Sequence, residues 1–463
     1  MTSAPTQGQR SAPKVRFGWV AGAWIVAGLA GALALRSHLL EERRELRLAP
    51  PATAGDVSTV RRALGERRLV LFSAGLGVFR PLAIDFLWLR AAHVQRKGES
   101  FEAAALARLI TALEPRLEAV WSFQARSLAY DIPPSFPPRE RPPWVRQALR
   151  LLRDDGLLNN PESAVLRLEL AFILEHKVGL DFDEAGPLYR SELAAALDHP
   201  AGSAEEAEAL RQWKLEKPLL DTLSARFGAP LDVRVAAVHA LYWAESGLAL
   251  QDVTRWHQRR LEDVRDGALW QLFDAGKVVR SAAGSRYAFL PDTRFLRAAG
   301  STLERERQKL TAEELSSVEA SLQATAVIAF YLEGNEAEAR SRWESHRDLL
   351  RPEGGSLDDL LVRWVTRQGE VSIVEAIAIC LDSENSLRSA GSPAADVLHR
   401  LAALLAARRD PTAAAESLEA LSSAARARWE SPVPPRDLPF HLEVLHPGYG
   451  QDAPAARTNG GRG

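Results

Sequence analysis

Cysteine and methionine are almost absent from this chain of 463 residues, which contains one of each. A single cysteine, Cys380, excludes an intramolecular disulfide and any zinc site built from cysteines. An excess of one charge is missing as well, because 58 Lys and Arg stand against 60 Asp and Glu and leave a net charge of -2. A dedicated nucleic-acid-binding protein carries a basic excess, so the composition argues against that class.

The common catalytic and metal-binding motifs are also missing. The ten histidines form no H-E-x-x-H, and their one close pair, His441 and His446, lies in a proline-rich segment. Gly75 and Gly77 lack the third glycine of a dinucleotide loop, and no G-x-S-x-G occurs. Cys380 ends an apolar run, which is typical of a buried and inert thiol. We therefore expect neither an enzyme nor a catalytic, cofactor or metal site.

A long uncharged segment is the first positive feature. Residues 17–35 carry no charge, and a helix that rises roughly 1.5 Å per residue crosses a hydrocarbon core of about 30 Å with this length. We predict a transmembrane anchor here, preceded by a disordered tail over residues 1–16. A cleaved signal peptide is one alternative, since Ala32-Leu33-Ala34 resembles an A-x-A site. A buried helix is the other.

The flanks of the predicted anchor bear on its orientation and association. Basic residues lie on both sides, so the positive-inside rule gives only a weak bias. A short tail before a first anchor most often stays in the cytoplasm, and we expect a single-pass inner-membrane protein with the bulk of the chain in the periplasm. Gly18 and Gly22 form a G-x-x-x-G, which indicates self-association of the anchor. The alternative is that the two glycines are there only because small residues are common in this Ala/Gly-rich chain.

The remaining chain divides by composition. We predict a juxtamembrane helix and linker over residues 36–57, a helical-repeat domain over 58–430, and a Pro/Gly-rich, largely disordered tail over 431–463. Residues 69–89 are apolar but contain charges, so a buried helix is favoured there over a second membrane span.

Two short segments depart from the helical pattern. Residues 277–290 contain two β-prone runs around a small turn, which predicts a hairpin. The proline-rich residues 133–143 suggest polyproline character, either as a stiff connector or as a docking site for an aromatic groove.

A sequence pattern of helix pairs appears twice. In each copy a glycine is followed five residues later by an alanine, and a proline closes the segment: Gly98, Ala103 and Pro115, then Gly334, Ala339 and Pro352. This pattern resembles the tetratricopeptide (TPR) repeat, which implies an all-α solenoid of stacked helix pairs. Ala339 should then lie at a close helix contact, with Trp343 buried beside it. An irregular helical bundle or α/α array is the alternative.

A second resemblance rests on motifs that follow one another along residues 70–300. They are Arg80-Pro-Leu-Ala-Ile-Asp-Phe-Leu-Trp-Leu-Arg90, Leu113-Glu-Pro115, Val120-Trp-Ser-Phe123, Asn160-Pro161, Glu175-His-Lys-Val-Gly179, Leu231-Asp-Val-Arg234 and His239-Ala-Leu-Tyr-Trp-Ala244. Together they resemble a family of uncharacterised bacterial membrane-anchored helical-repeat proteins. The resemblance implies an anchor followed by helical repeats, and it carries no function to this chain.

Charged residues form two candidate polar sites. His176 and Lys177 close a predicted helix, where cations meet the negative end of the helix dipole. Asp181 and Asp183 follow, so a polar binding site at this junction is the less favoured interpretation. Arg80, Asp85 and Arg90 lie on one apolar helix, where ion pairs within the domain are favoured over a binding role.

Aromatic residues gather in the short segment from His239 to Trp243. His239 and Trp243 are four residues apart and so share a helix face, with Tyr242 beside them. A packed aromatic seam is favoured over a ligand pocket.

The features together favour a membrane-anchored scaffold. Stacked helix pairs present an extended surface that suits a protein or peptide partner, and the tether restricts that partner to the cell envelope. The alternative is a helical enzyme or accessory subunit of an envelope polysaccharide or secretion system.

Overall fold

The structure is a computed structural model of the chain. It describes residues 80–350 except 181, 229 and 281–286, together with 355–365, 394–409 and single positions between 377 and 423. The predicted tail 1–16, anchor 17–35 with Gly18 and Gly22, linker 36–57 and tail 431–463 lie outside the described residues. So do both ends of the predicted domain 58–430, and these boundaries stay predictions.

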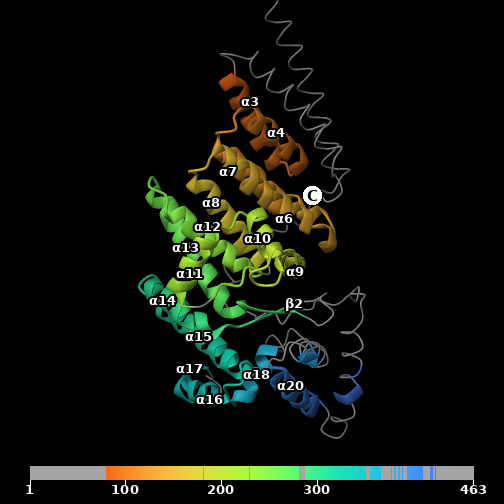
Figure 1. The fold of residues 1–463 in the computed structure, drawn as a ribbon, viewed down its shortest axis with the longest axis vertical. Helices are drawn as coiled ribbons and strands as arrows, with labels where there is room; N and C mark the ends of the chain where they lie inside the picture. Colours follow the sequence, from red (N-terminus) through yellow and green to blue (C-terminus); the bar gives the residue numbers. More distant parts are fainter. Residues whose placement is uncertain are drawn as a thin grey trace, which may run out of the picture. The chain divides into compact units, whose positions relative to one another are not determined.

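The chain forms two compact units, residues 1–114 and 115–463. In the first unit, α3 (Arg80–Arg96) packs along α4 (Ser100–Leu113) (Figure 1). Ala103, Ala104 and Ala107 of α4 are fully buried, because their short side chains let another helix approach closely. The described part of the apolar run 69–89 is therefore not a buried helix as predicted, since α3 buries only one of its faces.

The turns inside two helix pairs share one geometry. Gly98 lies between α3 and α4 with φ 77°, and Gly334 lies between α15 (Ala312–Leu332) and α16 (Glu336–Ser345) with φ 80°. In both turns the next residue donates its N–H to the carbonyl five residues back, from Glu99 to Val94 and from Asn335 to Phe330. This is the Schellman end of a helix, which favours glycine because φ is positive. Both glycines of the repeat-like pattern therefore lie in the turn that joins two paired helices.

Unit 2 begins with three long helices that change their winding. Each continues without a break from an α-helical into a π-helical segment: α5 (Glu118–Arg126) into η2 (Ser127–Asp131), α6 (Pro142–Arg150) into η5 (Leu151–Gly156) and α7 (Leu157–Asn159), and α8 (Ala164–Phe172) into η6 (Ile173–Gly179). The helices α9 (Gly186–Leu197), α10 (Ala204–Gln212), α11 (Lys217–Phe227), α12 (Ala236–Leu248) and α13 (Arg255–Ala275) follow. α12 packs on both α8 and α13.

The proline-rich connector is more compact than its composition predicted. It forms two 3-10 turns, η3 (Pro133–Ser135) and η4 (Pro138–Glu140), in place of an extended polyproline segment. α6 then begins directly at Pro142, because proline lacks only an N–H that the first helical turn does not use. The backbone N–H groups of Ser135 and Phe136 donate to the carbonyls of Ile132 and Pro133 and close the first of these turns.

The predicted hairpin is confirmed. β1 (Lys277–Arg280) pairs with β2 (Tyr287–Leu290) in antiparallel register, with Lys277 opposite Leu290. Helices resume with η7 (Thr293–Phe295), α14 (Leu296–Glu306), α15, α16, α17 (Arg347–Leu350), α18 (Leu357–Val365) and α20 (Ala394–Arg409). The described part is thus all-α with one small sheet, and its many helices are compatible with a helical repeat.

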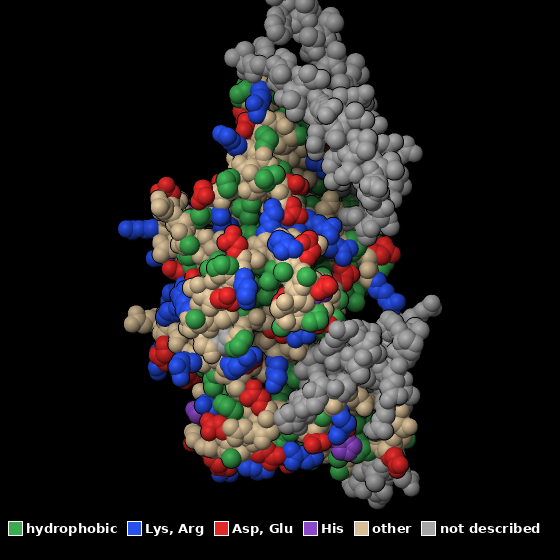
Figure 2. All heavy atoms as spheres, in the orientation of Figure 1, with side chains coloured by type: hydrophobic (Ala, Val, Ile, Leu, Met, Phe, Trp, Pro, Cys, Tyr) green, Lys and Arg blue, Asp and Glu red, His purple; other side chains and the backbone are tan. Residues whose placement is uncertain are grey.

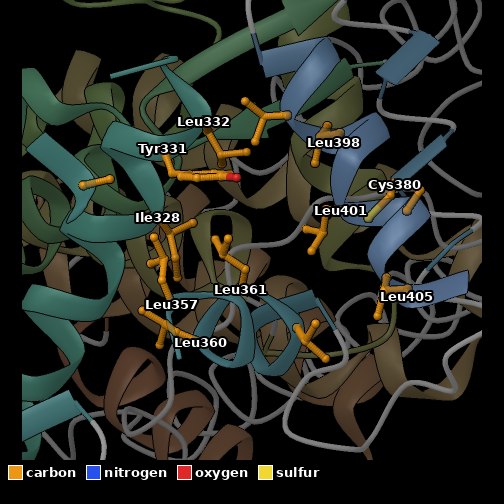
Figure 3. Close-up of a cluster of buried hydrophobic side chains, with 14 of the residues drawn as sticks. Ile328, Tyr331, Leu332, Leu357, Leu360, Leu361, Cys380, Leu398, Leu401 and Leu405 are labelled. Atoms are coloured by element: carbon orange, nitrogen blue, oxygen red, sulfur yellow. The ribbon is translucent and has the colours of Figure 1, made fainter. Parts of the chain in front are cut away.

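A hydrophobic core holds the last helices together. Side chains of α15, α18 and α20 converge there, among them Tyr331, Leu361 and Leu401 (Figure 3). Ala339 and Trp343 of α16 belong to this core with 0% and 4% exposure, as the repeat pattern predicts. Cys380 is fully buried, and burial raises the pKa of its thiol, as expected for an unreactive cysteine.

Among the described helices, α15 alone combines the length and apolar character needed to cross a membrane. Half of its most apolar stretch is buried inside the protein, where it packs against α14, α16 and α20.

Candidate functional site: an aromatic cluster over a buried lysine

The π-helical segment η6 places three consecutive residues in three different environments. Glu175 contacts α13, His176 joins a group of aromatic rings, and Lys177 is buried. A π-helical turn is wider than an α-helical one and occurs frequently at functional sites. The segment ends at Gly179, whose carbonyl accepts a hydrogen bond from Arg190 of α9. η6 is therefore the element from which the site is built.

Lys177 supplies a cation with no exposed side-chain surface. Its Nζ lies 2.5 Å from Oδ2 of Asp183. The same Nζ lies 4.7 Å from the ring centre of Phe182, and 5.4 and 5.5 Å from those of Tyr130 and Tyr189. An ammonium over aromatic rings gains cation–π attraction, and a buried charge needs such partners because it has lost its water. Burial still lowers the pKa of Lys177, with Asp183 opposing that effect.

Asp183 is held from several sides. Its Oδ1 accepts the backbone N–H of Ala185 at 2.8 Å, and its Oδ2 accepts the Tyr189 hydroxyl at 3.1 Å. Nη1 of Arg141, at the start of α6, lies 3.8 Å away. The carboxylate therefore connects the loop after η6 with α9 and with the first turn of α6.

Two of the rings against Lys177, those of Tyr130 and Phe182, belong to a group of four rings in mutual contact. We call Tyr130, Phe172, His176 and Phe182 the aromatic cluster. His176 stacks on Phe172 with ring centres 5.0 Å apart, and it lies 4.7 Å from Phe182. Tyr130 meets Phe182 edge to face at 5.4 Å. The rings come from η2, α8, η6 and the loop after η6. Phe182 is 48% exposed and the other three are partly exposed, so the cluster opens to the surface.

An arginine borders the aromatic cluster. The guanidinium of Arg126 lies 5.9 Å from the ring centre of Phe172, and its side chain is 59% exposed. Its Nε donates to Glu169 at 2.7 Å. Burial raises the pKa of Glu169 while Arg126 opposes the rise. Aromatic rings and arginine are the side chains enriched at the centres of protein interfaces.

Protonation of the site is set by burial and by the lysine. Burial and the neighbouring Lys177 cation lower the pKa of His176, so its ring is neutral at neutral pH. The Tyr130 hydroxyl lies 3.4 Å from Nδ1 of His176, and burial raises the pKa of that hydroxyl. The cluster thus presents neutral rings at its surface and keeps its charges beneath.

The sequence located part of this site. His176 and Lys177 do lie in the last turn of their helix, but Lys177 binds Asp183 and does not simply cap the helix end. Asp181 lies outside the described residues. Tyr130, Phe172 and Phe182 were missed; the only local signal was the spacing of Phe172 and His176, which places both on one helix face.

The charged helix α3 forms ion pairs with α4. Arg80 Nη2 lies 2.9 Å from Glu114 Oε2, and Arg90 Nη2 lies 2.6 Å from Glu102 Oε1. Ion pairs within the domain are confirmed, and the partners of both arginines are glutamates outside α3.

The aromatic segment of α12 is a packed seam, as predicted. His239, Tyr242 and Trp243 are all buried. His239 Nε2 lies 2.7 Å from the Val233 carbonyl, and Trp213 meets the imidazole edge to face at 5.1 Å. Tyr242 accepts the backbone N–H of Glu216 at 3.1 Å.

Metal-binding side chains do not cluster in the part of the chain that the structure describes. Within the residues that the structure describes, no three His, Cys, Asp or Glu side chains gather to hold a metal ion. His441, His446, Gly75 and Gly77 lie outside them. No family model matches the chain, and neither a curated protein nor a solved structure matches it.

Proposed function

We propose that this chain is a membrane-anchored, TPR-like helical scaffold that binds another protein at the bacterial cell envelope. The observation that carries the proposal is the aromatic cluster with Arg126. Its rings are partly exposed and contact one another, and two of them, Tyr130 and Phe182, lie against the buried Lys177 that Asp183 holds. Rings already held in place lose little conformational entropy when a partner covers them.

The chemistry of the cluster points to a partner segment with apolar or aromatic side chains. Neutral rings attract such groups by burial and stacking. Arg126 adds hydrogen-bond donors at the edge, where a carboxylate or carbonyl of the partner can be bound. Basic and acidic side chains are interspersed over the face drawn in Figure 2.

The TPR-like part of the proposal is supported by the two matched turns. Gly98 and Gly334 adopt the same left-handed conformation, and the alanine five residues later is fully buried in both pairs. Stacked pairs of this kind form extended binding surfaces.

The membrane part of the proposal rests on the uncharged residues 17–35. Deletion of residues 1–48 should release the protein into the soluble fraction. If the shortened chain stays in the membrane fraction after carbonate extraction, the proposed anchor is not the only membrane attachment and the proposed topology is wrong. The anchor is also proposed to self-associate through Gly18 and Gly22, and Gly22→Ile should then weaken the signal in a transmembrane-association reporter.

Site-specific crosslinking in cells tests the binding function. A photoreactive p-benzoylphenylalanine is placed at Phe182, and in a matched control at Leu158, an exposed leucine on α7. We expect one or a few specific envelope proteins at Phe182 and not at Leu158. The captured proteins should be lost when Phe172→Ala is added, provided that circular dichroism shows an unchanged fold.

Two results would refute the scaffold proposal. One is the same background of crosslinks at both positions. The other is stoichiometric binding of a glycan or a metal ion by the purified protein without any protein partner, which would favour the enzyme or accessory-subunit alternative.

A further inference from the structure

Helix α3 has two apolar faces. Leu87, Ala91 and Val94 face α4 and are buried, at spacings of four and three residues. Leu82, Phe86 and Leu89 repeat the same spacing, but they are 65%, 63% and 69% exposed. We call these three the exposed stripe. At 100° per residue the stripe points away from the buried face, so its side chains form one continuous apolar surface.

The stripe is unusual within the described residues. Their other exposed large hydrophobic side chains are single ones on separate segments: Leu117, Leu158, Phe182 and Trp256. A helix that is apolar on both sides is covered on both sides, either by protein or by lipid.

Basic side chains continue the stripe toward the end of α3. His93 and Arg96 follow Leu89 by four and seven residues, which places them on the same side of the helix. Both are exposed, and so is Lys97 in the turn beyond. The one acidic residue of α3, Asp85, lies beside the stripe. An apolar face with a basic end is the pattern of a helix that lies in the interface of an anionic membrane.

We propose that the exposed stripe is inserted into the interfacial region of an anionic phospholipid membrane, with His93, Arg96 and Lys97 against the lipid headgroups. The inference rests on the proposed anchor, since residues 17–35 would keep α3 at the membrane surface through the intervening residues 36–79. In the sequence the apolar run that reaches Leu89 begins at Leu69, before α3 itself. The anchor and α3 would then form two successive membrane contacts, and the stripe would fix unit 1 at the membrane.

Fluorescence quenching in vesicles tests the inference with the full chain. An environment-sensitive NBD label is attached at Phe86→Cys and, as the control, at Leu158→Cys. The buried Cys380 should not be labelled, and the unsubstituted chain verifies this. The protein is reconstituted into vesicles of phosphatidylglycerol and phosphatidylcholine, some of which contain brominated lipid.

We expect brominated lipid to remove most of the fluorescence at position 86 and none at position 158. Iodide in the water should quench only position 158. Leu82→Asp with Leu89→Asp should abolish lipid quenching at position 86 while the protein still floats with the vesicles. Vesicles of phosphatidylcholine alone should quench position 86 less, because they lack the anionic headgroups.

The outcomes separate this inference from the proposed anchor. Flotation of the protein with the vesicles reports the anchor, and quenching reports the stripe. A floating protein whose position 86 remains open to iodide overturns the inference and leaves the anchor standing. Protection from iodide without quenching by brominated lipid means that protein covers the stripe, which also overturns it. A protein that does not float refutes the anchor itself.

Discussion

Replacing Glu175 by glutamine should stabilise the protein above neutral pH. Glu175 lies on η6 against α13, where Nε2 of Gln271 donates to its Oε1 at 3.2 Å and to its backbone carbonyl at 3.1 Å. A Cβ at Gly267 would lie 2.7 Å from that Oε1, so α13 approaches the carboxylate closely. Burial raises the pKa of Glu175 from 4.5 to about 7, while Arg260 and Gln271 oppose the rise.

The sign of the effect follows from that direction. A carboxyl group whose pKa is raised in the folded state stabilises the fold below its unfolded pKa of 4.5, and this contribution is lost as the pH rises through about 7. One pKa unit corresponds to roughly 1.4 kcal/mol, so ionised Glu175 costs about 3 kcal/mol above pH 8. Glu175→Gln removes that cost. The amide of glutamine can still accept the hydrogen bond from Nε2 of Gln271 through its own Oε1.

Urea unfolding followed by tryptophan fluorescence measures the effect between pH 5 and pH 8.5. The free energy of unfolding of the Glu175→Gln variant should exceed that of the parent by about 3 kcal/mol at pH 8.5, and the difference should shrink toward pH 5. Glu313→Gln, which removes an exposed carboxylate of α15, should leave the pH dependence unchanged. A parent protein whose stability does not fall from pH 5 to pH 8 would refute the reasoning.

Three further predictions concern the core and the ion pair. Burial lowers the pKa of His239 to about 4, so its contribution to the free energy of unfolding should be full above pH 6.5 and should be lost, by about 3 kcal/mol, as the pH drops through 4. In the His239→Gln variant, the urea midpoint should depend less on pH over that range. Lys177→Met should destabilise by about 3 kcal/mol, because Asp183 loses its buried partner, and adding Asp183→Asn should recover part of that loss in a double-mutant cycle. Ala339→Trp should overpack the contact of α16 and cost roughly 1–3 kcal/mol, and an unchanged thermal midpoint would contradict the repeat interpretation there.

Local sequence signals predicted the elements of the fold well. The hairpin followed from two β-prone runs, and the turns at Gly98 and Gly334 followed from the glycine, alanine and proline spacing that resembles a TPR repeat. Each of these features depends on a few neighbouring residues, which is why a single sequence reveals it. The proline-rich connector was mispredicted because proline also fits the first turn of a helix, as it does at Pro142.

The aromatic cluster could not be predicted in the same way. Tyr130 and His176 lie on different helices, 46 residues apart in the sequence, and both are on π-helical segments, η2 and η6. No residue pattern in this sequence predicts a π-helical turn. The two faces of α3 were hidden for a different reason, since apolar residues on all sides of a helix do not tell which face a neighbouring helix covers.

The buried ion pair explains how a surface of aromatic rings can stay ordered while partly exposed to water. Phe182 lies in the loop after η6 and is half-exposed, and a lone exposed ring there would sample several rotamers. Lys177 lies under that ring and is itself fixed by Asp183, so the ring is held through its face and through the next residue of the chain. Loss of the lysine would therefore lower partner capture at Phe182 even where the helices remain folded. In the proposed scaffold function, the ion pair would act on binding by positioning the rings, and the rings would contact the partner.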